Sequence, residues 1–381
     1  MQRLATVLQN GVARFTLVWS IASASSLIVT AGWSQQPSIT WLGRLSRDGS
    51  SRAFGVSADG RCVVGYAMNP PWYRRAFRWT ADGGIQDLGT LGGSIGEAHG
   101  VSADGSVVVG WAENAAGQYR AFRWTASTGM QDLGTLGGNY SYAYDVSADG
   151  LVVVGGTLNA EGQSRVFRWT ASGGMQDLGT LGGSAYGVSA DGSVVVGTTI
   201  NTEGWHRAFR WTASEGAQDL GTLGSNYSNA LDVSADGSVV VGQSFNVVGQ
   251  SRAFRWTADG GIQDLGTLGG IGSWASGVSG NGSVVVGWSF NAAQQNRAFR
   301  WTQAGGMEDL NITYASLLTN GSYLEVADAI SPSGRYIVGE GYNAATRRIE
   351  GYLLDTVPEP ASLLALGAGL AGLLGLCRRK R

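Results

Sequence analysis

The side chains that could carry catalysis in this sequence are few. Its histidines are His99 and His206, and neither belongs to an obvious catalytic or metal-binding motif. Enzymes that cleave glycans need two carboxyl groups across the scissile bond, or a His or Tyr base. Four glutamates lie in segments that we expect to be loops, but no spacing pairs them: Glu97, Glu113, Glu161 and Glu203. The sequence therefore predicts a protein that is not an enzyme.

Cofactor and metal motifs are also missing from the sequence. Cys62 and Cys377 form no ligand motif. A Ser-Ala-Asp-Gly segment recurs, but it brings one carboxylate per copy, whereas a calcium loop needs several converging oxygens. Asp-Gly suits a tight hairpin, because Gly adopts positive φ and Asp bonds its own backbone. We therefore expect hairpins, no cofactor and no metal at the recurring aspartates: Asp59, Asp104, Asp149, Asp191 and Asp236.

Aromatic side chains offer a different chemistry, the recognition of carbohydrate. The chain has 14 Trp, 13 Tyr and 10 Phe, and many accompany Asn, Gln and Ser in segments that differ between copies of the repeat. Flat apolar rings beside amide and hydroxyl groups suit sugars. The alternative is that these rings only cover the tops of the sheets. The candidate ligand-binding residues are Trp72, Tyr73, Trp111, Tyr140, Tyr142, Trp205, Trp274 and Trp288.

The charge of the chain argues against nucleic acid as a partner. Residues 32–357 carry 20 Arg against 27 acidic residues, and the only lysine is Lys380, near the C-terminus. A mildly acidic body gains little from the release of phosphate counterions. We therefore expect no nucleic-acid partner.

A repeat of about 45 residues organises the body of the chain. The segment Phe-Arg-Trp-Thr recurs with its tryptophan at steps of 42 or 45 residues: Trp79, Trp124, Trp169, Trp211, Trp256 and Trp301. The segment Asp-Leu-Gly-Thr-Leu recurs five times, starting at Asp87. A fixed period of this length indicates a repeat architecture and overrides a domain count based on length.

Each repeat predicts four short strands. In the second copy they cover residues 98–102, 106–111, 120–125 and 130–136, all bounded by Gly, Asp or Asn. Four antiparallel strands in about 45 residues are typical of a β-propeller blade, with a β-solenoid as the main rival. A fourth-strand sequence at 41–45 precedes all others, and a third-strand sequence at 349–354 ends the series. We therefore predict an all-β, seven-bladed propeller over residues 41–355, closed by its N-terminal strand.

Two charged residues recur on neighbouring strands of six of the seven repeats. In the third copy they are Arg168, on the third strand, and Asp177, on the fourth. A buried arginine needs a partner. We therefore expect these repeated residues to pair within or between blades.

The two ends of the chain predict export. Residues 1–33 contain Arg3 and Arg14, then an apolar run and small residues, which predicts a signal peptide cleaved after Ala31, with an uncleaved anchor as the alternative. At the other end, residues 361–377 are apolar and predict a short membrane helix whose basic end stays in the cytoplasm. The flanking residues of this C-terminal signal are Val357, Pro358, Glu359, Pro360, Arg378, Arg379, Lys380 and Arg381.

Residues 357–381 resemble the PEP-CTERM sorting signal of Gram-negative bacteria in the order of motif, apolar helix and basic end. The resemblance implies an exosortase as processing partner, transient or permanent anchoring in the cytoplasmic membrane, and a context of exopolysaccharide and biofilm. Residues 41–354 resemble the extracellular HAF-type repeats, although Arg-Ala-Phe stands where that family has His-Ala-Phe. This second resemblance implies an extracellular repeat protein and transfers no catalytic residue.

Strand parity places the loops that vary between copies on one side of the predicted disc. Loops on a rigid scaffold are where binding residues concentrate. We therefore expect a secreted or surface-anchored, non-catalytic protein of the extracellular matrix that binds polysaccharide or a surface protein through this side. A glycan-active lyase or hydrolase, or a structural spacer without a specific ligand, are the alternatives.

Overall fold

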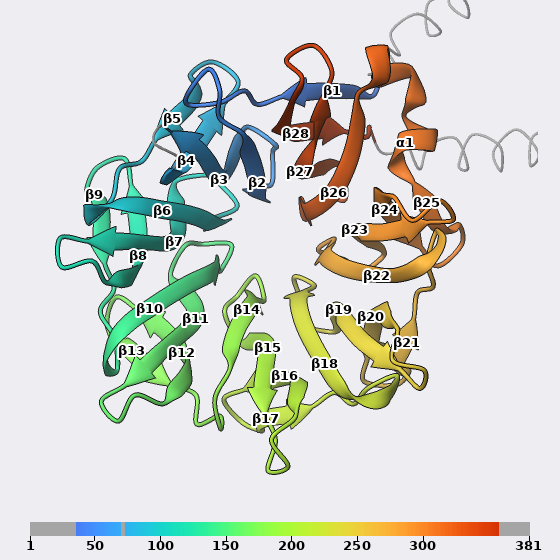
Figure 1. The fold of residues 1–381 in the computed structure, drawn as a ribbon. Coiled ribbons are helices and arrows are strands. Elements are labelled where there is room, and N and C mark those ends of the chain that lie inside the picture. Colours follow the sequence, from blue (N-terminus) through green and yellow to red (C-terminus); the bar gives the residue numbers. More distant parts are fainter. Residues whose placement is uncertain (1–35, 70–72, 358–381) are drawn as a thin grey trace, which may run out of the picture. The chain divides into compact units, whose positions relative to one another are not determined.

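The computed structural model describes residues 36–69 and 73–357, which form seven four-stranded antiparallel sheets arranged around an axis (Figure 1). The prediction of an all-β, seven-bladed propeller is confirmed. The predicted signal peptide, the cleavage site at Ala31 and residues 358–381 lie outside the described residues. Within the described ranges, no helix has the length and apolar character needed to cross a membrane.

Blades 1 to 6 each contain four strands consecutive in sequence, from the axis outward. Blade 1 has β2 (Ser51–Val56), β3 (Cys62–Asn69), β4 (Tyr73–Thr80) and β5 (Gly84–Asp87). Blade 2 has β6 (Gly92–Val101), β7 (Val107–Asn114), β8 (Tyr119–Thr125) and β9 (Gly129–Asp132). Blade 3 has β10 (Gly137–Val146), β11 (Val152–Asn159), β12 (Ser164–Thr170) and β13 (Gly174–Asp177).

The second half of the ring follows the same order. Blade 4 has β14 (Ser184–Val188), β15 (Val194–Ile200), β16 (His206–Thr212) and β17 (Gly216–Asp219). Blade 5 has β18 (Gly224–Val233), β19 (Val239–Asn246), β20 (Ser251–Thr257) and β21 (Gly261–Asp264). Blade 6 has β22 (Gly269–Val278), β23 (Val284–Asn291), β24 (Asn296–Thr302) and β25 (Gly306–Asp309).

Blade 7 joins the two ends of the described chain. It contains β26 (Tyr323–Ile330), β27 (Tyr336–Asn343), β28 (Arg348–Asp355) and, as its outer strand, β1 (Ser38–Trp41). The short helices α1 (Leu310–Thr313), η1 (Ala315–Leu317) and η2 (Thr319–Gly321) precede it. Because β1 pairs with β28, from Ser38 opposite Asp355 to Trp41 opposite Tyr352, the predicted closure by the N-terminal strand is confirmed.

The predicted position of the closing strand was wrong by a few residues. The strand ends at Trp41 instead of spanning 41–45, because Gly43 turns the chain with a φ of 81°. Gly89 does the same after β5, with a φ of 83°. A side chain with a Cβ adopts such values reluctantly. The Asp-Leu-Gly-Thr-Leu segment is therefore the end of a fourth strand followed by a connection.

The hydrophobic core lies between neighbouring blades. Branched apolar residues on both faces of each second strand are buried, as Val153 and Val154 show on β11. Between blades 3 and 4, Val154 packs in one cluster with Phe209 of the next blade. Burying a side chain of this size contributes about 1.5–3 kcal/mol. Each blade therefore depends on its neighbour for stability.

The recurring Ser-Ala-Asp-Gly segments are hairpins, as predicted. In blade 2, Asp104 accepts hydrogen bonds from the Ser102 hydroxyl at 2.6 Å and from the Ser106 N–H at 3.0 Å. These bonds lower the pKa of Asp104 to about 2. Gly105 supplies the positive φ, at 72°. The carboxyl group of this aspartate therefore stabilises its own turn.

The same turns are joined around the axis by backbone hydrogen bonds. The N–H of Ala58 donates to the carbonyl of Ala103 in the next blade at 2.9 Å, and the series continues until Gly280 donates to Pro332. Proline has no N–H. The series of bonds therefore stops at Pro332, in blade 7.

The expected pairing of the repeated Arg and Asp was wrong in its partners. Arg168 donates from Nε to the carbonyl oxygen of Gly192 in the next blade at 3.2 Å. Asp177 instead lies 3.1 Å from Nε of Arg165, on the same blade. Arg165 and Arg168 lie on opposite faces of β12, because side chains alternate along a strand. Arg168 therefore contacts the next blade, whereas Arg165 forms the ion pair with the repeated Asp.

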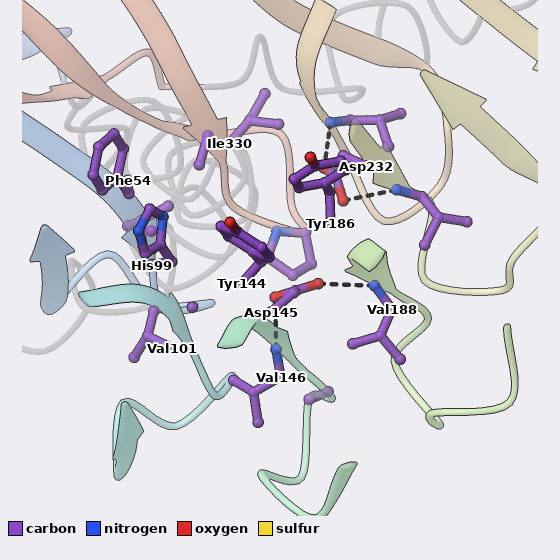
Figure 2. A pocket seen from close by; sticks show the side chains of 18 of the residues that line it. Phe54, His99, Val101, Tyr144, Asp145, Val146, Tyr186, Val188, Asp232 and Ile330 are labelled. Atoms are coloured by element: carbon purple, nitrogen blue, oxygen red, sulfur yellow. Dashed lines mark hydrogen bonds between the residues drawn. The ribbon is translucent and has the colours of Figure 1, made fainter. Parts of the chain in front are cut away.

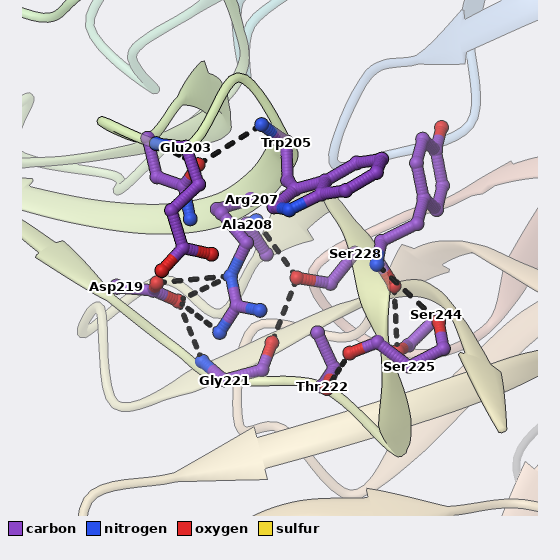
Figure 3. A network of polar contacts seen from close by, with 12 residues as sticks. Glu203, Trp205, Arg207, Ala208, Asp219, Gly221, Thr222, Ser225, Ser228 and Ser244 are labelled. Atoms are coloured by element: carbon purple, nitrogen blue, oxygen red, sulfur yellow. Dashed lines mark hydrogen bonds and ion pairs between the residues drawn. The ribbon is translucent and has the colours of Figure 1, made fainter. Parts of the chain in front are cut away.

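Figure 3 shows the corresponding contacts in blade 4. Asp219 lies 2.9 Å from Nε of Arg207 and accepts a hydrogen bond from the N–H of Gly221 at 2.8 Å. The hydroxyl of Ser228, from blade 5, accepts from the N–H of Ala208 and donates to the carbonyl of Gly221. The repeated Asp therefore holds the connection between blades in place.

Candidate ligand site at the propeller axis

The blades differ from one another mainly at three positions near the axis. Two are on the inner strand and flank a small buried residue, which is Ala143 in blade 3. The third lies on the second strand, opposite the first of them. In blade order the inner-strand residues are Arg52, Glu97, Tyr142, Ser184, Asn229, Trp274 and Val326, then Phe54, His99, Tyr144, Tyr186, Leu231, Ser276 and Asp328. The second-strand residues are Tyr66, Trp111, Gly156, Thr198, Gln243, Trp288 and Glu340.

One side of the ring carries the connections between second and third strands and between blades, such as residues 115–118 and 133–136 of blade 2. We call this side the variable face. The opposite side, with the Asp-Gly hairpins, is the uniform face. The residues that repeat maintain the fold. The side chains of the variable face can therefore differ between blades and are free to bind a ligand.

A cavity of about 210 Å³ lies on the axis (Figure 2). All seven blades line it, through Phe54 and its counterparts, through valines such as Val146, and through the joined turns at the uniform face. At the inner-strand position directly after Phe54 and its counterparts, most copies have Gly or Ala. A Cβ on Gly55 would lie 2.7 Å from the carbonyl oxygen of His99, which explains why most blades have no side chain there.

Two blades instead carry an aspartate at this position, Asp145 in blade 3 and Asp232 in blade 5. Asp145 accepts hydrogen bonds from its neighbour Val146 at 2.8 Å and from Val188 of blade 4 at 2.9 Å (Figure 2). Asp232 accepts from Val233 at 2.7 Å, and from blade 6 at 2.8 Å. Each carboxyl group therefore links the inner strands of two blades.

Both carboxyl groups titrate far above their usual range. Burial raises the pKa of Asp145 to about 8, and the nearby charge of Asp232 adds to the rise. Burial also raises the pKa of Asp232 to about 7, against the two backbone hydrogen bonds that it accepts. At neutral pH the pair therefore retains one proton or more, and one carboxyl group is available as a donor.

Aromatic rings form one wall of the cavity. His99 stacks on Phe54 with ring centroids 4.7 Å apart, and its edge meets Tyr144 at 5.3 Å. Tyr144 contacts Tyr186 of blade 4 at 5.0 Å. Blades 5 to 7 have Leu231, Ser276 and Asp328 at these positions. The wall therefore covers the half of the axis formed by blades 1 to 4.

Blades 7 and 1 meet in a cluster of arginine and carboxyl side chains. Arg52 donates two hydrogen bonds to Asp328, at 2.9 and 2.7 Å, and lies 3.1 Å from Glu340. Burial raises the pKa of Glu340 to about 7, although Arg52 opposes the rise. Burial opposes the charge of Arg52, but its two carboxylate partners raise the pKa of the guanidinium above its usual value.

The glutamates that the sequence singled out do not form a pair. Glu97 lies on β6 instead of in a loop, 2.5 Å from Arg74 and 3.2 Å from His99. Burial works to raise its pKa, but these two partners lower it overall. Glu113 lies on β7 and accepts from a backbone N–H at 2.7 Å. Glu161 and Glu203 are exposed in turns.

Five of the eight candidate ligand-binding residues form two clusters on strands, which corrects their expected location in loops. Trp111 and Tyr142 meet between blades 2 and 3 at 5.7 Å, and Tyr140 lies 5.5 Å from Tyr142. Trp274 and Trp288 stack at 3.9 Å in blade 6.

The remaining candidates lie outside these clusters of ring contacts. Tyr73 begins β4 and is 45% exposed, whereas Trp205 lies in the turn before β16 and is 46% exposed. Trp72 lies outside the described residues. Sequence reasoning also missed Asp145 and Asp232, although a signal existed: both replace a residue that is Gly in four other copies.

The C-terminus matches a known sorting family. Residues 356–380 match the PEP-CTERM protein-sorting motif. This motif implies export, processing by an exosortase and a location at the surface of a Gram-negative cell. No curated protein matches the chain in sequence.

The solved structures that resemble this chain have low sequence identity to it. The propeller domain of the Trilobed protease from Pyrococcus furiosus, described as having an open velcro topology, has a TM-score of 0.54 at 9% identity, with 86% of this chain and 99% of that chain covered. Putative TolB from Agrobacterium tumefaciens has a TM-score of 0.47 at 17% identity, with 69% and 88% covered. The likeness to the first of these structures shows the fold alone. This chain differs from the first in that β1 closes the ring.

Proposed function

We propose that this protein is a non-catalytic component of the extracellular matrix that binds polysaccharide through its variable face. The observation that carries the proposal is the pair of aromatic clusters, around Trp111 and Tyr142 and around Trp274 and Trp288. These rings are partly exposed and lie on rigid strands. The sorting motif supports the proposal, because an exported protein meets such polymers.

The geometry of the clusters suits sugar rings better than a protein partner. Trp274 and Trp288 are cross-strand partners with an interplanar angle of 12°, so their positions are fixed by the sheet. Preformed aromatic platforms keep the entropic cost of binding low. Amide side chains flank them in blade 5, where Gln243 and Asn229 face each other across the strands. Flat apolar faces beside uncharged hydrogen-bonding groups are complementary to a polysaccharide.

The test is co-sedimentation of the purified, secreted protein with the extracellular polysaccharide of the producing cell. The decisive variant is Trp274→Ser with Trp288→Thr, since Ser184 and Thr198 form the same cross-strand pair in blade 4. The fold therefore already accepts this pair. We expect the variant to lose most of its retention.

A matched control removes an exposed apolar side chain from the uniform face. Leu151 is 58% exposed in its hairpin, where other copies have serine, as at Ser106. Leu151→Ser should sediment like the unmodified protein. Equal retention of both variants, or no retention of the unmodified protein, would contradict binding through the variable face and favour a protein partner or a spacer.

A glycan-cleaving enzyme is the second candidate, favoured by the two carboxyl groups near the axis. Glycosidases use such a pair, one member as acid and the other as base or nucleophile. The length of the polymer after incubation separates the two functions. A shortened polymer that stays intact with Asp145→Gly and Asp232→Gly would establish the enzyme. An unchanged length supports the binding protein.

A further inference from the structure

The fold does not require the two aspartates at the axis. Gly55, Gly100, Gly187 and Gly277 occupy the same position in other blades, and those blades close the same ring. Two half-buried carboxyl groups that line one cavity are costly to bring close to each other. Their presence in blades 3 and 5 therefore needs a reason other than folding.

The carboxyl groups have no positively charged side chain beside them in the cavity. Of the described residues that line it, none is Arg or Lys, and the titratable ones are His99, Tyr144, Tyr186 and Asp328 besides the pair. Asp328 is already bound to Arg52, and His99 lies against Glu97. Each oxygen of the pair accepts one backbone hydrogen bond, and a carboxylate oxygen can accept a second. The cavity is thus an acceptor-rich space that lacks a cation.

The size and lining of the cavity limit the kinds of cation that it could bind. Its volume of about 210 Å³ is below the roughly 300–1,000 Å³ of pockets for drug-sized ligands. A bare metal ion would leave the aromatic wall without a role, whereas a ring with one apolar face would lie against Tyr144 and Tyr186. Aromatic faces also attract organic ammonium groups.

We propose that the axial cavity binds an amino sugar, with its protonated amine between Asp145 and Asp232 and its ring against the aromatic wall of Phe54, His99, Tyr144 and Tyr186. Neither Trp274 nor Trp288 lines this cavity, whereas Tyr142 of the other aromatic cluster stacks on Tyr144 of the wall with ring centroids 6.4 Å apart. The amine supplies the positive charge that the cavity lacks, and the hydroxyl groups of the ring meet Ser276 and Asp328. Binding displaces protons from the carboxyl pair, because the cation favours the ionised form.

Glucosamine is the probe, measured by calorimetric titration of the secreted protein, with N-acetylglucosamine and glucose as uncharged analogues. We expect glucosamine to bind with release of protons, seen as a heat that depends on the ionisation enthalpy of the buffer. N-acetylglucosamine should bind at least about tenfold more weakly, since it loses charge-assisted hydrogen bonds.

The decisive variant is Asp145→Gly with Asp232→Gly, which copies the residue of the other blades. The matched control is Asp82→Ser with Asp259→Ser. It removes two exposed carboxylates and copies the serine of other turns, such as Ser127. We expect the first variant to lose glucosamine binding and the second to keep it.

Three results would overturn the inference: no binding of glucosamine, equal affinity for glucosamine and N-acetylglucosamine, or unchanged binding by the Asp-to-Gly variant. Its failure is separable from that of the proposed function. Sedimentation with polysaccharide tests Trp274 and Trp288, and the glucosamine titration tests the aspartates. A loss of binding without loss of the folded signal in circular dichroism excludes misfolding as the cause.

Discussion

Replacing Asp145 and Asp232 by Gly should make the propeller more stable at neutral pH and flatten its dependence on pH. In the folded protein the two carboxyl groups have pKa values of about 8 and about 7, against about 3.9 for an ordinary aspartate. Between about pH 3.9 and pH 7, both carboxyl groups keep their protons in the folded state but have lost them in the unfolded state. Stability therefore falls as pH rises through this window.

The magnitude follows from the number of protons involved. One proton per pH unit corresponds to 1.36 kcal/mol, so two carboxyl groups lower the free energy of unfolding by about 3 kcal/mol per pH unit between roughly pH 5 and 7. Below about pH 3 both states are protonated and the effect vanishes. Glu340 also has a raised pKa, but it is present in both proteins and cancels in the comparison.

The assay is unfolding in urea, an uncharged denaturant, at about pH 5, 6 and 7, followed by tryptophan fluorescence. The unfolding midpoint of the unmodified protein should fall with pH more steeply than that of the double variant. The control Asp82→Ser with Asp259→Ser should follow the unmodified protein. Parallel midpoints for the unmodified protein and the Gly variant would refute the reasoning, because they would show that the buried carboxyl groups ionise as easily as exposed ones.

Three further predictions test the packing, the charge cluster and the sorting signal. Phe167→Ala should cost about 3–5 kcal/mol in unfolding free energy, because the ring is fully buried, whereas Leu181→Ala, 63% exposed, should change it by less than about 0.5 kcal/mol in the same urea titration. Arg52→Met should lower the free energy of unfolding by about 3–5 kcal/mol in the same titration, since the largely buried carboxyl group of Asp328 loses its partner. Replacement of Pro358–Pro360 by alanines should leave unprocessed chain in the membrane fraction on an immunoblot; normal release would contradict sorting through this motif.

The period of the sequence determined the architecture. Because each copy contains four strands and a fourth-strand sequence precedes the first copy, seven blades and closure by the N-terminal strand follow from counting. Local chemistry was equally readable: Asp-Gly predicts a hairpin wherever it occurs, and Asp104 forms one. The C-terminal sorting motif also needs no fold to be recognised.

The tertiary structure decided which side chains meet. Asp145 and Asp232 are far apart in the sequence and each resembles a small local variation, so only closure of the ring places both in one cavity. The partners of Arg168 and Arg165 were equally hidden, because a strand has two faces and the sequence does not say which neighbour each face meets. Local propensity acts between adjacent residues, whereas burial, pKa and ligand chemistry depend on all seven blades at once.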